Sequence, residues 1–335
     1  ADHIHGDGLL SNGALATLSA TIASSDIGGD DYIEGNGGND TVYGGLGQDD
    51  IAGGSSSLYN LTTPSQRPDG ADTIFGGNGD LVDRNNYGDT VLPESTRHAR
   101  DADMILGDNG NIQRLVGING IDGGNLLTFA YDNYDAAAKI VVRAATLLDY
   151  TSGGHDFDPA NAANDIGAGD VIHGESGDDF IYGMVGNDIL FGDAQDDDLI
   201  GGYGHDWISG GTGSDGVLGD DGRIYTSRNT VGDDAIQLSE PLYGIGNIEV
   251  DRDSDTLELR TPGDLQQAFV NKLGELKKSV NLTPFNVQQD NGAQDPLYDA
   301  QYADDIIYGG LGGDFLHGGA GDDAISGAEA LPEYY

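Results

Sequence analysis

The chain has 335 residues, enough for two domains or one elongated solenoid. It carries 58 acidic against 14 basic residues, a formal net charge of −44, which excludes nucleic acid as a natural partner because both would be polyanions. No apolar run approaches the ~20 residues that span a bilayer, and the absence of cysteine excludes disulfides and thiolate-bound zinc. A chain this acidic repels itself, so we expect bound cations to neutralise its carboxylates.

A nine-residue pattern recurs along the chain: Gly-Gly-x-Gly-x-Asp-x-U-x, in which U is a large apolar residue. Copies begin at Gly35, Gly44, Gly174, Gly183, Gly201, Gly309 and Gly318. Glycines at the turn permit positive φ, and the sixth-position aspartate supplies carboxylate oxygen. This repeat predicts an all-β fold, a parallel β-roll solenoid of nonapeptide repeats whose ligand is Ca²⁺.

The sixth-position aspartates are the candidate metal ligands, because Ca²⁺ prefers six to eight hard oxygen atoms. Two of them stand alone between insertions, and the others keep a spacing of nine within three clusters. In chain order they are Asp31, Asp40, Asp49, Asp72, Asp103, Asp170, Asp179, Asp188, Asp197, Asp206, Asp215, Asp305, Asp314 and Asp323.

Two units make one full coil, so aspartates eighteen residues apart are expected to stack with an ion between them. The stacked pairs are Asp31/Asp49, Asp170/Asp188, Asp179/Asp197, Asp188/Asp206, Asp197/Asp215 and Asp305/Asp323.

The eighth position is expected to point inward, which gives each unit a single core side chain. These residues are Ile33, Val42, Ile51, Ile172, Ile181, Leu190, Leu199, Ile208, Val217, Ile307, Leu316 and Ile325. So thin a core stabilises little alone. At ~1–10 mM Ca²⁺ and a Kd near ~10⁻⁴ M, each site would add roughly 1.4–2.7 kcal/mol.

The repeats are grouped into three expected modules, residues 1–112, 113–222 and 223–335. Blocks of roll close on a similar signature, Gly6-Asp7-Gly8, then Gly107-Asp108-Asn109-Gly110, then Gly219-Asp220-Asp221-Gly222. Non-repeat sequence follows each closure, as solenoids tolerate at their corners. Because the chain begins inside a repeat, we expect it to be a segment of a longer protein.

The insertions differ in character and give the fold some expected α/β content. Residues 53–69 and 78–100 are polar loops, whereas residues 113–164 contain a strand or short buried helix over 139–148. The largest insertion, 223–300, has strand-like alternation at 248–250 and 256–260. It also predicts an amphipathic helix from Asp264, with an apolar face of Leu265, Phe269, Leu273, Leu276 and Val280.

The nonapeptides resemble those of the RTX family, the hemolysin-type calcium-binding repeats. The resemblance implies a right-handed parallel β-roll, Ca²⁺ at the turns, type I secretion, and folding outside the cell. Three turns depart from the pattern at the fourth position, where Ala168, Gln195 and Ala303 replace glycine. We expect weaker ion binding at those turns.

The seventh and ninth positions should face outward, yet many are apolar. Ile189, Phe191 and Trp207 lie on one predicted sheet, and Phe180, Tyr182 and Ile200 lie on the other. Either the insertions fold over these faces, or one face meets another copy or another protein.

No catalytic motif stands out, since GxSxG and HExxH are absent and the repeat accounts for most paired carboxylates. The favoured function is a calcium-binding structural or adhesive module, an adhesin-like part of a secreted, extracellular or cell-surface bacterial protein that folds on Ca²⁺ binding and assembles into a layer or filament. One alternative is the calcium-stabilised part of an RTX-linked secreted enzyme. Another is a glycan- or protein-binding module that uses the insertions.

Overall fold

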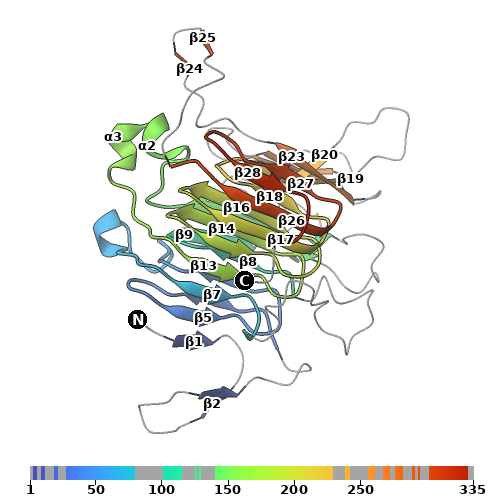
Figure 1. Ribbon diagram of the computed structural model, residues 1–335. Coiled ribbons are helices and arrows are strands. Elements are labelled where there is room, and N and C mark those ends of the chain that lie inside the picture. The colour runs from blue at the N-terminus through green and yellow to red at the C-terminus, as the bar shows by residue number, and fades with distance from the viewer. Residues whose placement is uncertain are drawn as a thin grey trace.

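The computed structural model describes residues 28–79, 101–114, 140–228 and 302–330, residues 125, 126, 128 and 129, and short strands in the remaining segments. Most strands are three to seven residues long and belong to two parallel sheets that face each other (Figure 1). The stack runs from blue to red in Figure 1, so its order largely follows the chain. The predicted parallel β-roll is confirmed.

The first sheet has eight strands, all paired in parallel. In spatial order they are β1 (His3–His5), β5 (Thr41–Tyr43), β7 (Thr73–Phe75), β13 (Val171–His173), β15 (Ile189–Phe191), β17 (Trp207–Gly213), β26 (Ile306–Gly312) and β28 (Ala324–Ser326). The second sheet has seven: β27 (Phe315–His317), β18 (Gly216–Leu218), β16 (Asp198–Tyr203), β14 (Phe180–Val185), β8 (Met104–Leu106), β6 (Asp50–Ala52) and β4 (Tyr32–Glu34). All three expected modules contribute strands to these same two sheets.

The core is one column of aliphatic side chains between the sheets. Its buried members are Ile33, Val42, Ile51, Ile74, Ile105, Ile172, Ile181, Leu190, Leu199, Ile208, Val217 and Ile307, with Leu316 partly buried beside them. The structure adds Ile74 and Ile105 to the predicted set. It also corrects one member: Ile325 is 48% exposed, because β28 is the last strand of its sheet.

Insertions leave the roll from inside single nonapeptides, and we call these interrupted turns split turns. After Gly53-Gly54 the chain returns at Gly70-Ala71-Asp72, and strands β6 and β7 then occupy consecutive places in the roll. The same happens between Gly76-Gly77 and Asp103, between Gly107-Asp108 and Asp170, and between Gly219-Asp220 and Asp305.

Backbone conformation at the second position separates continuous turns from split ones. In continuous turns even non-glycine residues there have positive φ, as at Asn36 (68°), Glu175 (70°), Met184 (78°) and Asp193 (69°). The second-position residues of the split turns, Gly54, Gly77, Asp108 and Asp220, do not. The left-handed residue therefore bends the chain into the next strand, and its loss lets the insertion leave.

The insertion after β8 forms a hairpin against the roll. Strand β9 (Gly110–Arg114) pairs antiparallel with β12 (Arg143–Leu147), and β11 (Ile140–Val141) pairs with β10 (Thr128–Phe129). Residues 139–148, predicted as strand or short helix, thus fold as strand where described. Both hairpin arginines reach Asp50: Arg114 Nε lies 2.6 Å from Oδ2 and Arg143 Nε lies 2.9 Å from Oδ1.

The remaining described elements lie in the loops and insertions. They are β2 (Leu9–Ser11), β3 (Ser19–Thr21), the 3₁₀ helix η1 (Pro64–Gln66), α2 (Gly154–Phe157), α3 (Pro159–Ala162), β19 (Arg223–Arg228), β20 (Leu238–Pro241), β21 (Thr256–Arg260), β22 (Gln267–Asn271), β23 (Leu276–Asn281), β24 (Gln289–Asp290) and β25 (Ala293–Gln294).

The helix predicted from Asp264 is wrong. Its span contains β22, which pairs antiparallel with β21, and β23, which pairs with β19. Gly274 lies between these strands, and a glycine inside a helix costs about 1 kcal/mol relative to alanine. Cross-strand hydrogen bonds satisfy the backbone instead. The strand predicted over 256–260 is confirmed as β21, whereas residues 248–250 lie outside the described part of the chain.

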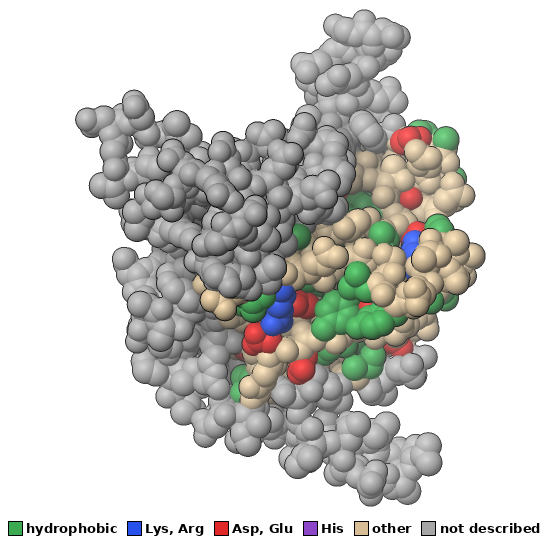
Figure 2. Space-filling view, turned by 180° about the vertical axis from the view of Figure 1, so that it is seen from behind, with side chains coloured by type: hydrophobic (Ala, Val, Ile, Leu, Met, Phe, Trp, Pro, Cys, Tyr) green, Lys and Arg blue, Asp and Glu red, His purple; other side chains and the backbone are tan. Residues whose placement is uncertain are grey.

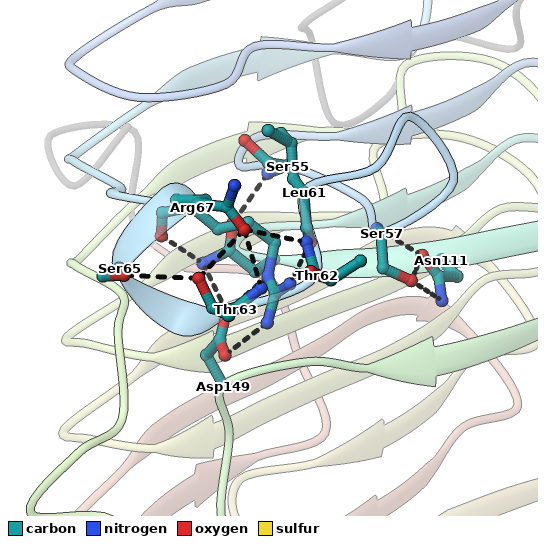
Figure 3. Close-up of polar contacts among 11 residues, drawn as sticks. Ser55, Ser57, Leu61, Thr62, Thr63, Ser65, Arg67, Asn111 and Asp149 are labelled. Carbon is teal, nitrogen blue, oxygen red and sulfur yellow. Dashed lines mark hydrogen bonds and ion pairs between the residues drawn. The ribbon is translucent and has the colours of Figure 1, made fainter.

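A buried arginine fastens the first insertion to the insertion over residues 113–164. Arg67 is 4% exposed and donates from Nε and Nη2 to the two carboxylate oxygens of Asp149, at 2.7 and 2.6 Å (Figure 3). It also donates to the Leu61 carbonyl oxygen. Asn109 donates to the Arg67 carbonyl oxygen at 3.0 Å and accepts from the Ser55 amide at 2.7 Å. Two loops far apart in sequence are thereby held beside the roll.

The outer face of the seven-stranded sheet is covered. Phe180, Tyr182, Ile200 and Leu218 are each at most 2% exposed, and a second apolar cluster joins them to hairpin and insertion residues, namely Ile112, Ala145, Leu147, Tyr150 and Ile224. On this sheet the prediction that insertions cover the roll is confirmed. Figure 2 shows the molecule from behind, where hydrophobic side chains (green) form a patch beside basic (blue) and acidic (red) side chains.

The outer face of the eight-stranded sheet carries a stack of rings. Tyr43, Phe75, His173 and Phe191 lie on successive strands with centroids 5.0, 5.3 and 4.2 Å apart and ring planes within 12° of parallel. Trp207 continues the row at 5.1 Å from Phe191. Beside them Ile189 and Ile306 remain 38% and 42% exposed. This face is less completely covered than the other.

We predict that the core column has an interior and an end. Ile181→Ala, at a fully buried position, should lower the free energy of unfolding by about 2–5 kcal/mol because it removes buried methyl groups and leaves a cavity. Ile325→Ala should cost about 1 kcal/mol or less. Denaturant unfolding in saturating calcium measures both, and equal costs would contradict a core that ends at Leu316.

Candidate metal centres

All fourteen sixth-position aspartates fall into two columns, one along each edge of the roll. The first column runs Asp31, Asp49, Asp103, Asp179, Asp197, Asp215 and Asp314. The second runs Asp40, Asp72, Asp170, Asp188, Asp206, Asp305 and Asp323.

One hydrogen bond repeats along both columns. The backbone amide of each aspartate donates to Oδ1 of the next aspartate in its column, at 2.7–3.2 Å. For example, the Asp170 amide donates to Asp188, whose own amide donates to Asp206, each at 2.8 Å. A hydrogen bond from an amide to a carboxylate is stronger than one from an amide to a neutral acceptor. One oxygen of each such carboxylate therefore fixes the side chain against the roll.

The second oxygen of these carboxylates faces the turn. In the middle of both columns, Oδ2 is buried and has no hydrogen-bond partner in Asp72, Asp103, Asp170, Asp179, Asp188, Asp206 and Asp305. A buried carboxylate oxygen without a partner costs free energy that folding has to recover elsewhere. The pattern repeats from turn to turn, which indicates that a ligand of the turns satisfies these atoms.

A first-position glycine lies against each of these oxygens. A β-carbon at Gly53 would lie 2.6 Å from Asp72 Oδ2 and would overlap the Gly107 carbonyl, and one at Gly107 would lie 2.5 Å from Asp170 Oδ2 and collide with the Gly183 carbonyl. Glycine is thus required because a carboxylate oxygen and a carbonyl oxygen converge beside its α-carbon. Converging hard oxygens are the ligands that Ca²⁺ selects.

Burial raises the pKa of several column aspartates. Desolvation is the largest cause throughout, and repulsion from neighbouring carboxylates adds to it at several of them. It raises the pKa of Asp72 to about 8 and the pKa values of Asp188 and Asp305 to about 7. For Asp103, Asp170, Asp179 and Asp206 the pKa lies well above its usual value. A divalent cation at the turns would remove this charge penalty.

Within the described residues, no group of three acidic or histidine side chains is placed to hold a metal ion by side chains alone. An ion at the turns would take carboxylates from stacked turns together with backbone carbonyls, a donor set that suits Ca²⁺ and not Zn²⁺. The residues present fit Ca²⁺: the sixth-position aspartates would hold it, and its charge would offset theirs.

All six predicted stacked pairs are direct neighbours in the columns. Sequence reasoning missed six further contacts that span insertions, Asp40/Asp72, Asp49/Asp103, Asp72/Asp170, Asp103/Asp179, Asp206/Asp305 and Asp215/Asp314. A search for the two halves of a split nonapeptide would have found them.

The fourth-position departures have structural explanations. Ala168 and Ala303 lie where the chain re-enters the roll after an insertion, and Gln195 adopts φ of 83° in place of a glycine. Asp197, beyond Gln195, still accepts the Asp179 amide at 2.9 Å. Weaker calcium binding at these turns stays a prediction.

Comparison with protein families finds the RTX calcium-binding nonapeptide repeat in four copies, at residues 27–57, 167–199, 191–223 and 300–329. The chain therefore contains a calcium-binding module of RTX repeats, and its cofactor is Ca²⁺. Asp72 and Asp103 lie outside the matched segments, yet the structure places them within the same columns. A comparison with curated proteins gave no match for this chain.

We predict that acid partly replaces calcium. The pKa values of Asp72, Asp188 and Asp305 are raised in the folded chain, so without calcium their protonation favours folding. That contribution is complete below about pH 4 and is lost as the pH rises through about 7–8. Circular dichroism in calcium-free buffer should show more β-structure near pH 5 than near pH 8.

The same pH series in saturating Ca²⁺ is the control and should be nearly flat, because the ions then balance the carboxylates. A calcium-free chain that is equally folded at both pH values would contradict the charge penalty assigned to the columns.

Proposed function

We propose that this chain is a calcium-dependent structural module of a secreted or cell-surface protein, and that it folds when Ca²⁺ binds its turns. The observation that supports this is the pair of buried aspartate columns. A net charge of −44 opposes compaction, and the columns concentrate part of that charge in the interior. Bound cations at regular intervals offset this repulsion.

The thin core supports the same proposal. A single column of aliphatic side chains leaves limited apolar burial per turn. Ions at millimolar concentration, each contributing roughly 1.4–2.7 kcal/mol, would together decide whether the roll forms. Such a chain stays unfolded where calcium is scarce and folds where calcium is abundant.

Calcium dependence favours an extracellular location and export before folding, as in type I secretion, because free Ca²⁺ is abundant outside cells. Among the described residues, no helix is long and apolar enough to cross a membrane. We assign no catalytic role to the chain, and an enzyme linked to the roll would have its reactive groups in an insertion or in another chain segment.

Calcium should drive folding of the wild-type chain. Titration at neutral pH is expected to give a coil-to-β transition between submillimolar and millimolar Ca²⁺, followed by far-UV circular dichroism. Mg²⁺ is the control and should be ineffective, because it demands a smaller octahedral site and keeps its water. A chain that is fully folded in chelator would overturn the proposal.

Self-assembly is a second candidate, favoured by the exposed apolar residues of the eight-stranded sheet. Ile189 and Ile306 are neighbours of Trp207 on adjacent strands and lie on the outer face. The ring stack beside them does not favour glycan binding, because the rings cover each other's faces and present their edges. Another protein surface, or a second copy, suits this face better.

Charges on this face should abolish any assembly. Ile189→Lys with Ile306→Lys is expected to leave folding intact and to reduce the particle size in calcium to that of the monomer, measured by light scattering. Leu58→Lys is the control, since Leu58 is 46% exposed in the insertion that follows β6, a strand of the seven-stranded sheet. Unchanged assembly in the double variant would exclude this face as the interface.

A further inference from the structure

Each of the four split turns has a second acidic side chain beside it, in addition to its sixth-position aspartate. A β-carbon on Gly54 would lie 2.7 Å from Asp69 Oδ2. A β-carbon on Gly77 would collide with Glu175 Oε2. In the other two split turns the second-position residue is itself acidic, Asp108 and Asp220. Two continuous turns also have an acidic second-position residue, Glu175 and Asp193, so the second carboxylate is not confined to split turns.

Asp220 is the second-position acid whose hydrogen bonding is incomplete. It is 3% exposed, its Oδ2 accepts the Ala320 amide, and its Oδ1 is buried without a hydrogen-bond partner. Its own amide donates to the Gly318 carbonyl at 3.1 Å. Asp220 is therefore fixed against the next turn of the roll, with one carboxylate oxygen unsatisfied.

Asp305, the sixth-position aspartate of the same split turn, lies beside it. Asp305 is 2% exposed, and its Oδ2 is likewise buried without a partner. That oxygen and the Gly318 carbonyl converge on the position that a β-carbon on Gly219, the residue before Asp220, would occupy. Desolvation by burial, to which the nearby charge of Asp305 adds, raises the pKa of Asp220 to about 9.

Asp108 at the equivalent position behaves differently. Its Oδ1 accepts the Ala168 amide at 3.1 Å and its Oδ2 accepts the Val185 amide at 2.8 Å, so both oxygens have protein donors. Asp220 makes only the second of these two bonds. Its Oδ2 accepts a hydrogen bond from the Ala320 amide, which is the equivalent of the Val185 amide in the nonapeptide. Of the two acidic second-position residues of the split turns, only Asp220 thus has an unsatisfied oxygen, and Asp69 Oδ2 beside the first split turn is also buried without a partner.

We propose that Asp220 and Asp305 bind one Ca²⁺ together at the turn where the insertion after β18 leaves the roll. Two buried carboxylates match the charge of a divalent cation, and the Gly318 carbonyl adds a neutral oxygen. The second carboxylate compensates for turn residues that the insertion has displaced. The proposal rests on the calcium-dependent roll and adds a ligand that the repeat does not encode.

This ion would also organise the neighbouring insertion. Asp221 follows Asp220 and accepts the hydroxyl groups of Tyr150 and Tyr182 and the Gly153 amide. Because Asp220 and Asp221 are adjacent, a cation that fixes Asp220 would also hold Asp221 in place beside these three donors. The proposed site thereby links the seven-stranded sheet, the segment around α2 and the start of the last insertion.

The test replaces Asp220 with its neutral isostere. Asp220→Asn keeps an oxygen for the Ala320 amide and loses only the charge, so the proposal predicts one fewer bound Ca²⁺ per chain by equilibrium dialysis. The calcium concentration at the folding midpoint should rise by about tenfold if this ion is needed for the roll. Asp322→Asn, at an exposed residue with the same charge change, should leave both values unchanged.

Asp220→Glu keeps the charge and is expected to retain the full ion count. An Asn variant that does not fold while the Glu variant folds with all its ions also supports the proposal, since charge is then the decisive property. The same ion count and midpoint in Asp220→Asn and wild type would overturn it, as would failure of both variants to fold. Wild-type folding in chelator would instead refute the calcium-dependent roll itself.

Discussion

The roll depends on how its buried carboxylates are held. Each sixth-position aspartate uses one oxygen to accept the amide of the preceding aspartate in its column, and in the middle of the columns the other oxygen faces the turn unsatisfied. The hydrogen bond fixes strand register without any cation, whereas the second oxygen makes that arrangement costly without one. The same aspartate side chain would therefore both fix the strand register and provide an oxygen for Ca²⁺.

Most of the fold could be predicted from the sequence because the repeat fixes three things at once, namely a glycine turn, a carboxylate and a core residue. Asp72 and Asp103 were predicted to be ligands, but their neighbours in the columns were not predicted, because spacing says nothing about which distant turn closes an interruption. Ile325 fits the pattern and is nevertheless exposed, since burial depends on a following strand. The helix predicted from Asp264 was wrong because apolar periodicity in a short segment does not show whether the segment will pair with another strand.

Split turns explain how a solenoid with a one-residue core accepts large insertions. Each insertion begins after the second position and ends before the sixth, so the strand, its core residue and its aspartate are untouched. The backbone at the second position leaves the left-handed region, which redirects the chain at little steric cost. Insertions can therefore differ in length while the columns remain continuous, as the link between Asp206 and Asp305 shows.

The insertions cover the two outer faces of the roll to different extents. On the seven-stranded sheet, the β9–β12 hairpin is anchored to Asp50 by Arg114 and Arg143 and buries the apolar surface. On the eight-stranded sheet, stacked rings protect one another, and exposed isoleucines remain. Because the insertions cover one face and leave the other partly exposed, any assembly built through the exposed isoleucines would approach the roll from one side and have a defined orientation.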